Sequence, residues 1–118
     1  MYNCVMYSKE LLKGTLKTIV LKLLSEHDKM YGYEITQHVK SETSGKIVLT
    51  EGALYPTLHK LEAQGLVATE KVVYGGRTRK YYKITESGES AAREKINEFA
   101  EFITTMKFIF KGNLSTES

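Results

Sequence analysis

The stretch LTEGALYPTLHKLEAQGL, residues 49–66, decides the fold of this chain. Thr50 can cap a helix, because its hydroxyl accepts a hydrogen bond from an otherwise unpaired amide of the first turn. Gly65 can end the helix, because glycine enters the left-handed conformation without a steric penalty. Between them three leucines recur at i, i+4 and i+7, which is one face of an α-helix: Leu54, Leu58 and Leu61. We therefore predict an amphipathic helix between Thr50 and Gly65.

The opposite face of this helix is unusual for a surface that contacts only water. It has small residues at its start, then an imidazole and an ammonium group, with Tyr55 at its flank: Gly52, Pro56, His59, Lys60 and Ala63. Small residues let a backbone approach a large, rigid partner. Pro56 lacks an amide and costs a helix interior up to roughly 3 kcal/mol. Either the helix continues through it with a distorted first turn, or residues 50–55 form a loop; we favour a kinked helix. An ordinary surface helix is the alternative.

Composition places the chain among ordinary globular domains. Its 118 residues are 42% hydrophobic and 26% charged, with a single proline, which suits one domain with a modest core and no low-complexity linker. The net charge of +3 is a weak bias towards anionic partners. The single cysteine, Cys4, fits a reducing compartment, and no apolar run approaches the roughly 20 residues of a membrane-spanning helix. Polar residues interrupt any signal sequence, so we expect a cytoplasmic protein with no membrane partner.

The residues before the central helix predict two further helices. Ser8 can cap a first helix that runs to about Ser25 and buries Leu12, Leu16, Ile19, Val20, Leu23 and Leu24. Residues 31–39 predict a shorter second helix, in which Tyr33, Ile35 and Val39 can face the core, with contact to phosphate as the alternative for Tyr33. Residues 40–46 are a loop by composition, and residues 47–49 are expected to form a very short strand.

After Leu66 the apolar period changes from 3.6 to 2, which predicts strands. Residues 66–74 and 78–84 are joined by Gly75-Gly76, a signal for a hairpin with a type I′ or II′ turn. From residue 71 to residue 83 the hairpin has no acidic side chain and interleaves tyrosines with five cations: Lys71, Arg77, Arg79, Lys80 and Lys83. A solvated ribbon whose lysines protect an edge strand is the alternative. Five unopposed cations directly after the central helix favour DNA.

Thr85 can cap a long last helix over residues 86–111, which ends at Gly112. Its apolar residues keep an unbroken 4-3-4-3-4 spacing, broadened by Phe102: Ala92, Ile96, Phe99, Ile103, Met106 and Phe110. This seam would be about 27 Å long. Packing on its own domain is the alternative, but a domain of three short helices has little surface to cover such a seam. We therefore expect a homodimer with these side chains, Phe102 included, in the interface.

Three helices followed by a basic hairpin is the pattern of the winged helix-turn-helix. The predicted fold is mainly α with a small β-hairpin. Residues 8–85 would form a winged helix-turn-helix DNA-binding domain, and residues 86–112 a C-terminal dimerisation helix. The major groove, about 12 Å wide, admits one α-helix, while the hairpin reaches flanking phosphates or the minor groove. Two-fold symmetry would match two such helices to a pseudo-palindromic site.

Two groups of residues are assigned to DNA from this geometry. Base-edge or groove contacts are assigned to the central helix, at Thr50, Gly52, Tyr55, Pro56, His59 and Lys60. Phosphate contacts are assigned to the loop before it and to the hairpin, at Lys46, Arg77, Arg79 and Lys80. A winged-helix module that binds proteins instead of DNA is the alternative. An enzyme, a metal or a cofactor is not expected, because the three histidines lie on different segments and no phosphate-binding loop is present.

Four features, in this order along the chain, carry a resemblance to a known family: YGYEI at 31–35, EGALYPTLHKLEAQGLV at 51–67, GGRTRKYYKIT at 75–85, and Gly88. Over residues 10–90 the chain resembles the PadR family of bacterial transcriptional regulators. The resemblance implies a winged helix-turn-helix dimer, usually a repressor, whose single C-terminal helix supplies the dimer contact. In some compact members, aromatic residues at the dimer interface bind planar drugs. Phe99 and Phe102 lie where such an effector would bind.

Overall fold

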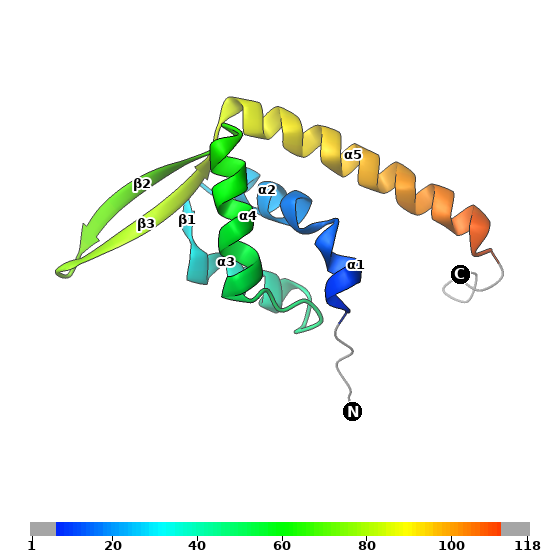
Figure 1. The fold of residues 1–118 in the computed structure, drawn as a ribbon, viewed down its shortest axis with the longest axis horizontal. Coiled ribbons are helices and arrows are strands. Elements are labelled where there is room, and N and C mark those ends of the chain that lie inside the picture. Colours follow the sequence, from blue (N-terminus) through cyan, green and yellow to red (C-terminus); the bar gives the residue numbers. More distant parts are fainter. Residues whose placement is uncertain (1–6, 112–118) are drawn as a thin grey trace.

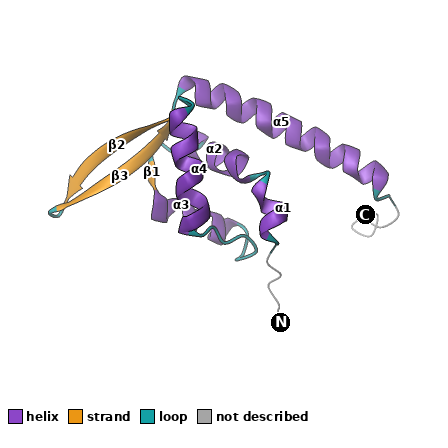
Figure 2. Ribbon diagram, viewed as in Figure 1, coloured by secondary structure: helices purple, strands orange, loops and turns teal. Residues whose placement is uncertain are grey.

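The structure, a computed structural model, describes residues 7–111 (Figure 1). Over these residues the chain forms five helices and three strands: α1 Lys9–Lys13, α2 Leu16–Ser25, β1 Met30–Tyr31, α3 Gly32–Glu42, α4 Glu51–Ala63, β2 Val67–Tyr74, β3 Arg77–Ile84 and α5 Glu86–Ile109. Figure 2 shows the long hairpin extending from one side of the helical body and α5 from the other. The predicted fold class, mainly α with a small β-hairpin, is confirmed. Cys4 and Gly112 lie outside the described residues.

The predicted first helix is divided into α1 and α2. The amide and the hydroxyl of Thr15 both donate to the carbonyl oxygen of Leu12, at 2.9 and 3.0 Å, which closes α1. Gly14 lowers the helix propensity at the same place. The prediction of one continuous helix over residues 8–25 is therefore wrong, although Ser8 does cap α1. α2 then supplies the buried residues Val20, Leu21, Leu23 and Leu24.

The third strand of the sheet was not predicted. Residues 47–49 form no strand, because the amide of Ile47 bonds to the hydroxyl of Thr43 at 3.0 Å and holds a turn. Instead, Met30 and Tyr31 form β1 and pair with β3. The prediction of a strand directly before α4 is therefore wrong.

α3 is longer than predicted and presents a different face. It continues to Glu42, past the expected end at Val39, so the first part of the predicted loop is helical. Ile35 and Val39 are buried, as predicted. Tyr33 is 64% exposed, so its predicted place in the core is wrong. The tyrosine stands instead on the outer surface of α3.

α4 has the termini that its sequence predicts. Thr50 accepts a hydrogen bond at 3.2 Å from the amide three residues later. At the other end Gly65 has φ +76°, and the amide of Leu66 donates to the carbonyl oxygen of Leu61 at 2.9 Å, which is a Schellman motif. The helix continues through Pro56, so the alternative of a loop over residues 50–55 is wrong.

The sheet is a three-stranded antiparallel ribbon in the order β1-β3-β2. Val67 lies opposite Ile84, and the register continues to the hairpin tip. Gly75 and Gly76 have φ of +57° and +82°, the two positive values that a type I′ turn requires. The hairpin is therefore confirmed, and its base is anchored by Val67 and by Tyr82, which are both 2% exposed.

The core lies between α2, α3 and α4 and the base of the hairpin. Side chains with less than 2% exposure come from every one of these elements, including Leu24, Ile35, Leu58 and Tyr82. The face of α4 that carries Leu54, Leu58 and Leu61 is fully buried in it. This packing leaves the opposite face of α4 at the molecular surface.

α5 follows β3 in the chain, and its first turn lies beside the C-terminal end of α4. The rest of the helix extends away from the body of the molecule. Thr85 caps α5 by accepting a hydrogen bond from the amide of Gly88 at 3.0 Å, and its hydroxyl donates to the carbonyl oxygen of Gly65 at 2.7 Å. Ala92 is 2% exposed and completes the core. Beyond Ala92 the helix extends away from the core towards one end of the molecule (Figure 1). The whole molecule measures 56 × 36 × 21 Å.

Candidate nucleic-acid interface

The outer face of α4 is exposed over its whole length. Most of the groove residues predicted on it lie at the surface: Thr50, Gly52, Pro56, His59 and Lys60. A Cβ built on Gly52 would meet no atom within 4 Å, so the backbone of the first turn is open to close approach. The polar part of this face, His59 and Lys60, follows two turns later.

Tyr55 lies on the flank of α4 and points inward. Its hydroxyl and ring fill the space beside Gly32, where an added Cβ would collide with the hydroxyl and lie 2.7 Å from Cζ. Burial raises the pKa of the Tyr55 phenol, and the charge of Glu51 and the nearby Tyr82 raise it further. Tyr55 therefore sets the position of α4 against the start of α3. Tyr55 is half-buried, so part of its ring stays at the surface and its assignment as a groove contact remains a prediction.

The loop before α4 is held in a defined shape. The hydroxyl of Thr43 donates to the carbonyl oxygen of Val39 at 2.8 Å and accepts from the amide of Ile47 at 3.0 Å. Gly45, with φ +80°, allows the reversal between these bonds. Lys46 is exposed on this loop, a few residues from the N-terminus of α4.

The cations of the hairpin do not share one face. Successive side chains of a strand alternate, so Arg77 and Arg79 lie on one face of β3 and Lys80 on the other. Lys80 lies directly opposite Lys71 on β2. Like charges at directly opposite positions destabilise a sheet, and a bound anion would relieve that repulsion.

Arg79 is oriented by aromatic rings from two other strands. Its guanidinium lies 4.3 Å from the centroid of Tyr31 on β1 and 5.2 Å from that of Tyr74 on β2. Such cation–π contacts contribute about 0.5–1 kcal/mol at exposed sites. A hydrogen bond with Tyr81 raises the pKa of Arg79, and the nearby Tyr31 and Tyr74 act in the same direction.

A carboxylate at the base of the hairpin limits the positive surface. Glu70 accepts a hydrogen bond from the ammonium group of Lys29 at 3.0 Å and lies 3.9 Å from that of Lys83. This bond and the two positive charges lower the pKa of Glu70. Lys83 is therefore partly neutralised, and the uncompensated cations lie towards the tip. The sequence interpretation missed this limit, because Glu70 lies just before the acid-free stretch.

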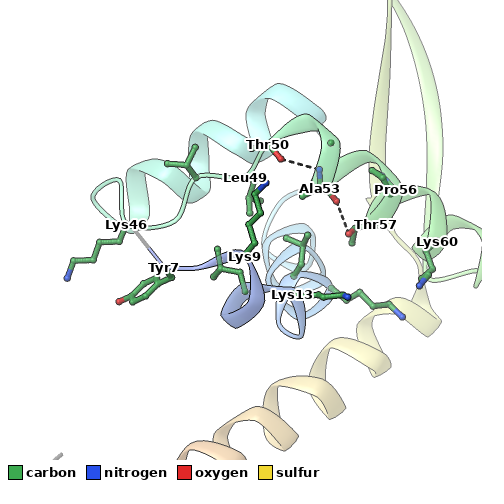
Figure 3. A pocket seen from close by; sticks show the side chains of 15 residues that line it. Tyr7, Lys9, Lys13, Lys46, Leu49, Thr50, Ala53, Pro56, Thr57 and Lys60 are labelled. Carbon is green, nitrogen blue, oxygen red and sulfur yellow. Dashed lines mark hydrogen bonds between the residues drawn. The ribbon is translucent and has the colours of Figure 1, made fainter. Parts of the chain in front are cut away.

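Three lysines near the N-terminus were also missed. Lys9, Lys13 and Lys17 line a hollow beside α4 together with Lys46 and Lys60 (Figure 3). Their spacing of i, i+4 and i+8 in the sequence could have indicated one basic face on the first helix.

The predicted dimer seam divides into two parts. Ala92 is buried in the core of its own chain, so its assignment to a dimer interface is wrong, and Ile96 and Met106 are half-buried. The other predicted residues are exposed apolar groups, between 39% and 55% exposed: Phe99, Phe102, Ile103 and Phe110. The rings of Phe99 and Phe102 are stacked at 6.4 Å between centroids. Phe108, which is 72% exposed, was missed because it lies off the heptad spacing.

Within residues 7–111 no helix is long and apolar enough to cross a bilayer. In the same part of the chain, no group of three or more His, Cys, Asp and Glu side chains is placed to hold a metal ion.

The core contains three helices, α2, α3 and α4, and the outer face of α4 is exposed. This arrangement, followed by a basic β-hairpin, defines a winged helix-turn-helix protein. The sequence matches the Transcriptional regulator PadR-like family over residues 20–94. The chain therefore belongs to the PadR-like family, which consists of DNA-binding transcriptional regulators and not of enzymes.

Two solved structures share this fold, and a further relative matches this chain in sequence over nearly its whole length. A transcriptional regulator from Clostridium thermocellum superposes with a TM-score of 0.77 at 31% identity, over 88% of this chain and 98% of that one. A PadR family transcriptional regulator from Eggerthella lenta has a TM-score of 0.77 at 30% identity, over 87% and 88%. An uncharacterised protein from Lysinibacillus sphaericus is 32% identical over 111 residues, 91% of this chain and 98% of its own length.

Proposed function

We propose that this chain is a homodimeric repressor that binds a pseudo-palindromic operator, with α4 of each protomer in a major groove. The observation that carries the proposal is the exposed outer face of α4, adjacent in the sequence to a hairpin without acidic residues from position 71 to position 83. A helix of this size fits the major groove, and cations beside it neutralise the flanking phosphates.

Each side chain has a distinct role in this proposal. Groove contacts come from the outer face of α4: Thr50, Gly52, Pro56, His59 and Lys60. Phosphate contacts come from the loop and the hairpin: Lys46, Arg77, Arg79 and Lys80. Arg77 and Lys80 lie on opposite faces of the ribbon. The edge of the hairpin would therefore lie against the sugar–phosphate backbone of the DNA, with one cation on each face of the ribbon near the phosphates. Arg79 would enter the complex already oriented by its tyrosine neighbours.

The C-terminal half of α5 is the proposed dimer surface. Contiguous exposed apolar groups on one helix are typical of an interface, and the stacked pair Phe99 and Phe102 lies at its start. Two-fold pairing there would place two copies of α4 about 34–36 Å apart, one helical turn of DNA, or a multiple of that spacing. We expect Phe102→Glu to convert dimers to monomers in sedimentation, and to weaken operator binding without unfolding the chain.

The DNA contacts are tested by selecting bound duplexes from a random library and then measuring the salt dependence of binding. Each lost phosphate contact should reduce the slope of log K against log salt by about 0.9. We expect this loss for Arg77→Ala and for Lys80→Ala. Lys22→Gln is the matched control, because Lys22 lies on α2 and pairs with Glu26 at 2.9 Å. Equal slopes in all four proteins would refute the assignment of the hairpin to phosphate.

A planar effector between the two α5 helices is a separate hypothesis. Phe99 and Phe102 are exposed enough to contact such a ring, and they already stack with an interplanar angle of 27°. Titration with a planar dye, followed by tyrosine fluorescence, should show saturation that is lost in Phe99→Ala. An unsaturable response would leave these rings with a packing role alone.

A further inference from the structure

The proposed function uses the α4 wall of the hollow beside α4 and leaves the walls from α1 and α2 unexplained. The hollow lies between α1, the start of α2, the loop before α4 and α4 itself, and its volume is about 770 Å³ (Figure 3). Ligand pockets typically measure roughly 300–1,000 Å³. The apolar lining is almost entirely aliphatic: Leu12, Leu16, Val48, Leu49, Ala53 and Pro56. Tyr7 is the aromatic exception among the described lining residues, so the hollow suits a flexible hydrocarbon better than a planar ring system.

The charged part of the lining is entirely positive. It consists of Lys9, Lys13, Lys17, Lys46 and Lys60, and no carboxylate contributes among the described lining residues. Nor does any of these five form an ion pair with another residue in the range 7–111. In Figure 3, Lys46 extends away from the hollow, whereas Lys13 and Lys60 extend towards each other at its rim.

Lys17 belongs to the same group of charges. Burial lowers the pKa of Lys17, and the ammonium groups of Lys95 and Lys60 lower it further by repulsion. Three helices, α2, α4 and α5, thus bring ammonium groups close together without a counter-ion from the described residues. Such repulsion costs free energy in the unoccupied protein and is relieved when an anion binds.

We propose that this hollow binds a single-chain alkyl carboxylate, a free fatty acid. The carboxylate would be held by the ammonium groups of Lys13, Lys17 and Lys60, and the chain would lie on the aliphatic floor. Charge complementarity selects an anionic head, and the apolar lining selects a hydrocarbon tail. A cationic or uncharged amphiphile of the same length would satisfy only the second requirement.

Such a ligand would also regulate DNA binding; this step rests on the proposed function. Thr50, Gly52, Pro56 and Lys60 line the hollow and are also proposed groove contacts. A bound carboxylate would neutralise Lys60, and its chain would cover the open backbone at Gly52. Fatty acid and operator would then compete for one face of α4, so the ligand would act as an inducer.

Calorimetric titration of the full chain tests the site without DNA. The probes are dodecanoate, dodecanol and dodecyltrimethylammonium, which share one chain and differ in the charge of the head. The two ionic probes are kept below their micellar concentrations, and dodecanol below its solubility limit. We expect dodecanoate to bind saturably, dodecanol to bind at least about fivefold more weakly, and the cation not to bind. Equal affinity for all three probes, or no saturable binding of dodecanoate, would overturn the proposal.

Substitutions in the lining of the hollow test whether dodecanoate binds there. Lys13→Gln and Lys17→Gln should each weaken dodecanoate binding about fivefold. Lys40→Gln is the matched control, because Lys40 is an exposed lysine on α3 that does not line the hollow. Ala53→Phe should fill the space and abolish binding, with an unchanged circular dichroism spectrum as the check on folding. If Lys13→Gln and Lys17→Gln weaken operator binding but leave dodecanoate affinity unchanged, these lysines contact DNA and the proposal is wrong.

Competition separates this proposal from the one on which it rests. We expect dodecanoate to release bound operator from the wild-type protein, and to do so about fivefold less effectively from Lys17→Gln. A ligand-free protein that binds no duplex would refute the proposed function while the calorimetric result stands. Saturable dodecanoate binding that leaves the operator complex intact would overturn the inducer role.

Discussion

Gly88→Ala tests how the fold positions the last helix relative to α4. A Cβ at this position would collide with the carbonyl oxygen of Leu66 and would lie 2.6 Å from Cγ1 of Ile84. The carbonyl group belongs to the backbone, and its oxygen already accepts a hydrogen bond from the amide of Thr85 at 3.0 Å. It cannot turn away as a flexible side chain could. The substitution must therefore displace the start of α5 or break this bond.

The magnitude follows from two opposing effects. Overpacking a close-packed site costs up to about 3 kcal/mol. The greater helix propensity of alanine offsets about 1 kcal/mol of this. We expect a net loss of about 2 kcal/mol in the free energy of unfolding. With an unfolding entropy of about 2.1 cal/mol/K per residue over 118 residues, this loss lowers Tm by about 8 °C.

Thermal unfolding followed by circular dichroism, at one fixed protein concentration, measures the effect. Gly52→Ala is the matched control, because Gly52 also lies in the first turn of a helix but has no atom within 4 Å of an added Cβ. We expect the control to be as stable as the wild type, or more stable by up to about 1 kcal/mol. A Gly88→Ala protein with the Tm of the control would refute the steric argument.

Three further predictions concern the cap of α5 and two titrating groups. Thr85→Ala should lose about 2 kcal/mol in urea unfolding, because the cap to Gly88 and the bond to the carbonyl of Gly65 are both removed, whereas Thr85→Ser should keep most of both. The lowered pKa of Glu70 means that its charged form stabilises the fold above about pH 4.3 and that this contribution is lost as pH falls. The stability of Glu70→Gln should therefore fall less steeply as the solution is acidified. A fall as steep as that of the wild type would contradict the Lys29 contact. The raised pKa of Tyr55 means that the unfolded chain ionises first, so stability falls as pH rises above about 10; Tyr55→Phe should reduce that fall in denaturant midpoints.

Local signals in the sequence determined α4 and the hairpin. Thr50 and Gly65 end α4 where predicted, since a cap and a left-handed glycine act through hydrogen bonds to neighbours a few residues away. Gly75 and Gly76 determine the turn and therefore the register of the strands on either side. The family resemblance rests on these same stretches, which is why fold class and family could both be predicted.

Features that depend on contacts between distant residues were not predictable in this way. β1 forms because Met30 and Tyr31 meet β3, about 50 residues later in the chain. Tyr55 turns inward because Gly32, on another helix, leaves room for its ring. The spacing of apolar residues in α4 alone cannot reveal that space.

The surface residues show the same division between what the sequence predicts and what only tertiary packing determines. The acid-free stretch from residue 71 to residue 83 could be read directly from the sequence, as could the apolar residues along the last helix. The orientation of Arg79 by Tyr31 and Tyr74, and the meeting of Lys17 with Lys60 and Lys95, arise only when three separate elements pack together. Caps, turns and periodicity act within a few residues of the chain, whereas the position of one charge relative to another is set by packing across the whole domain.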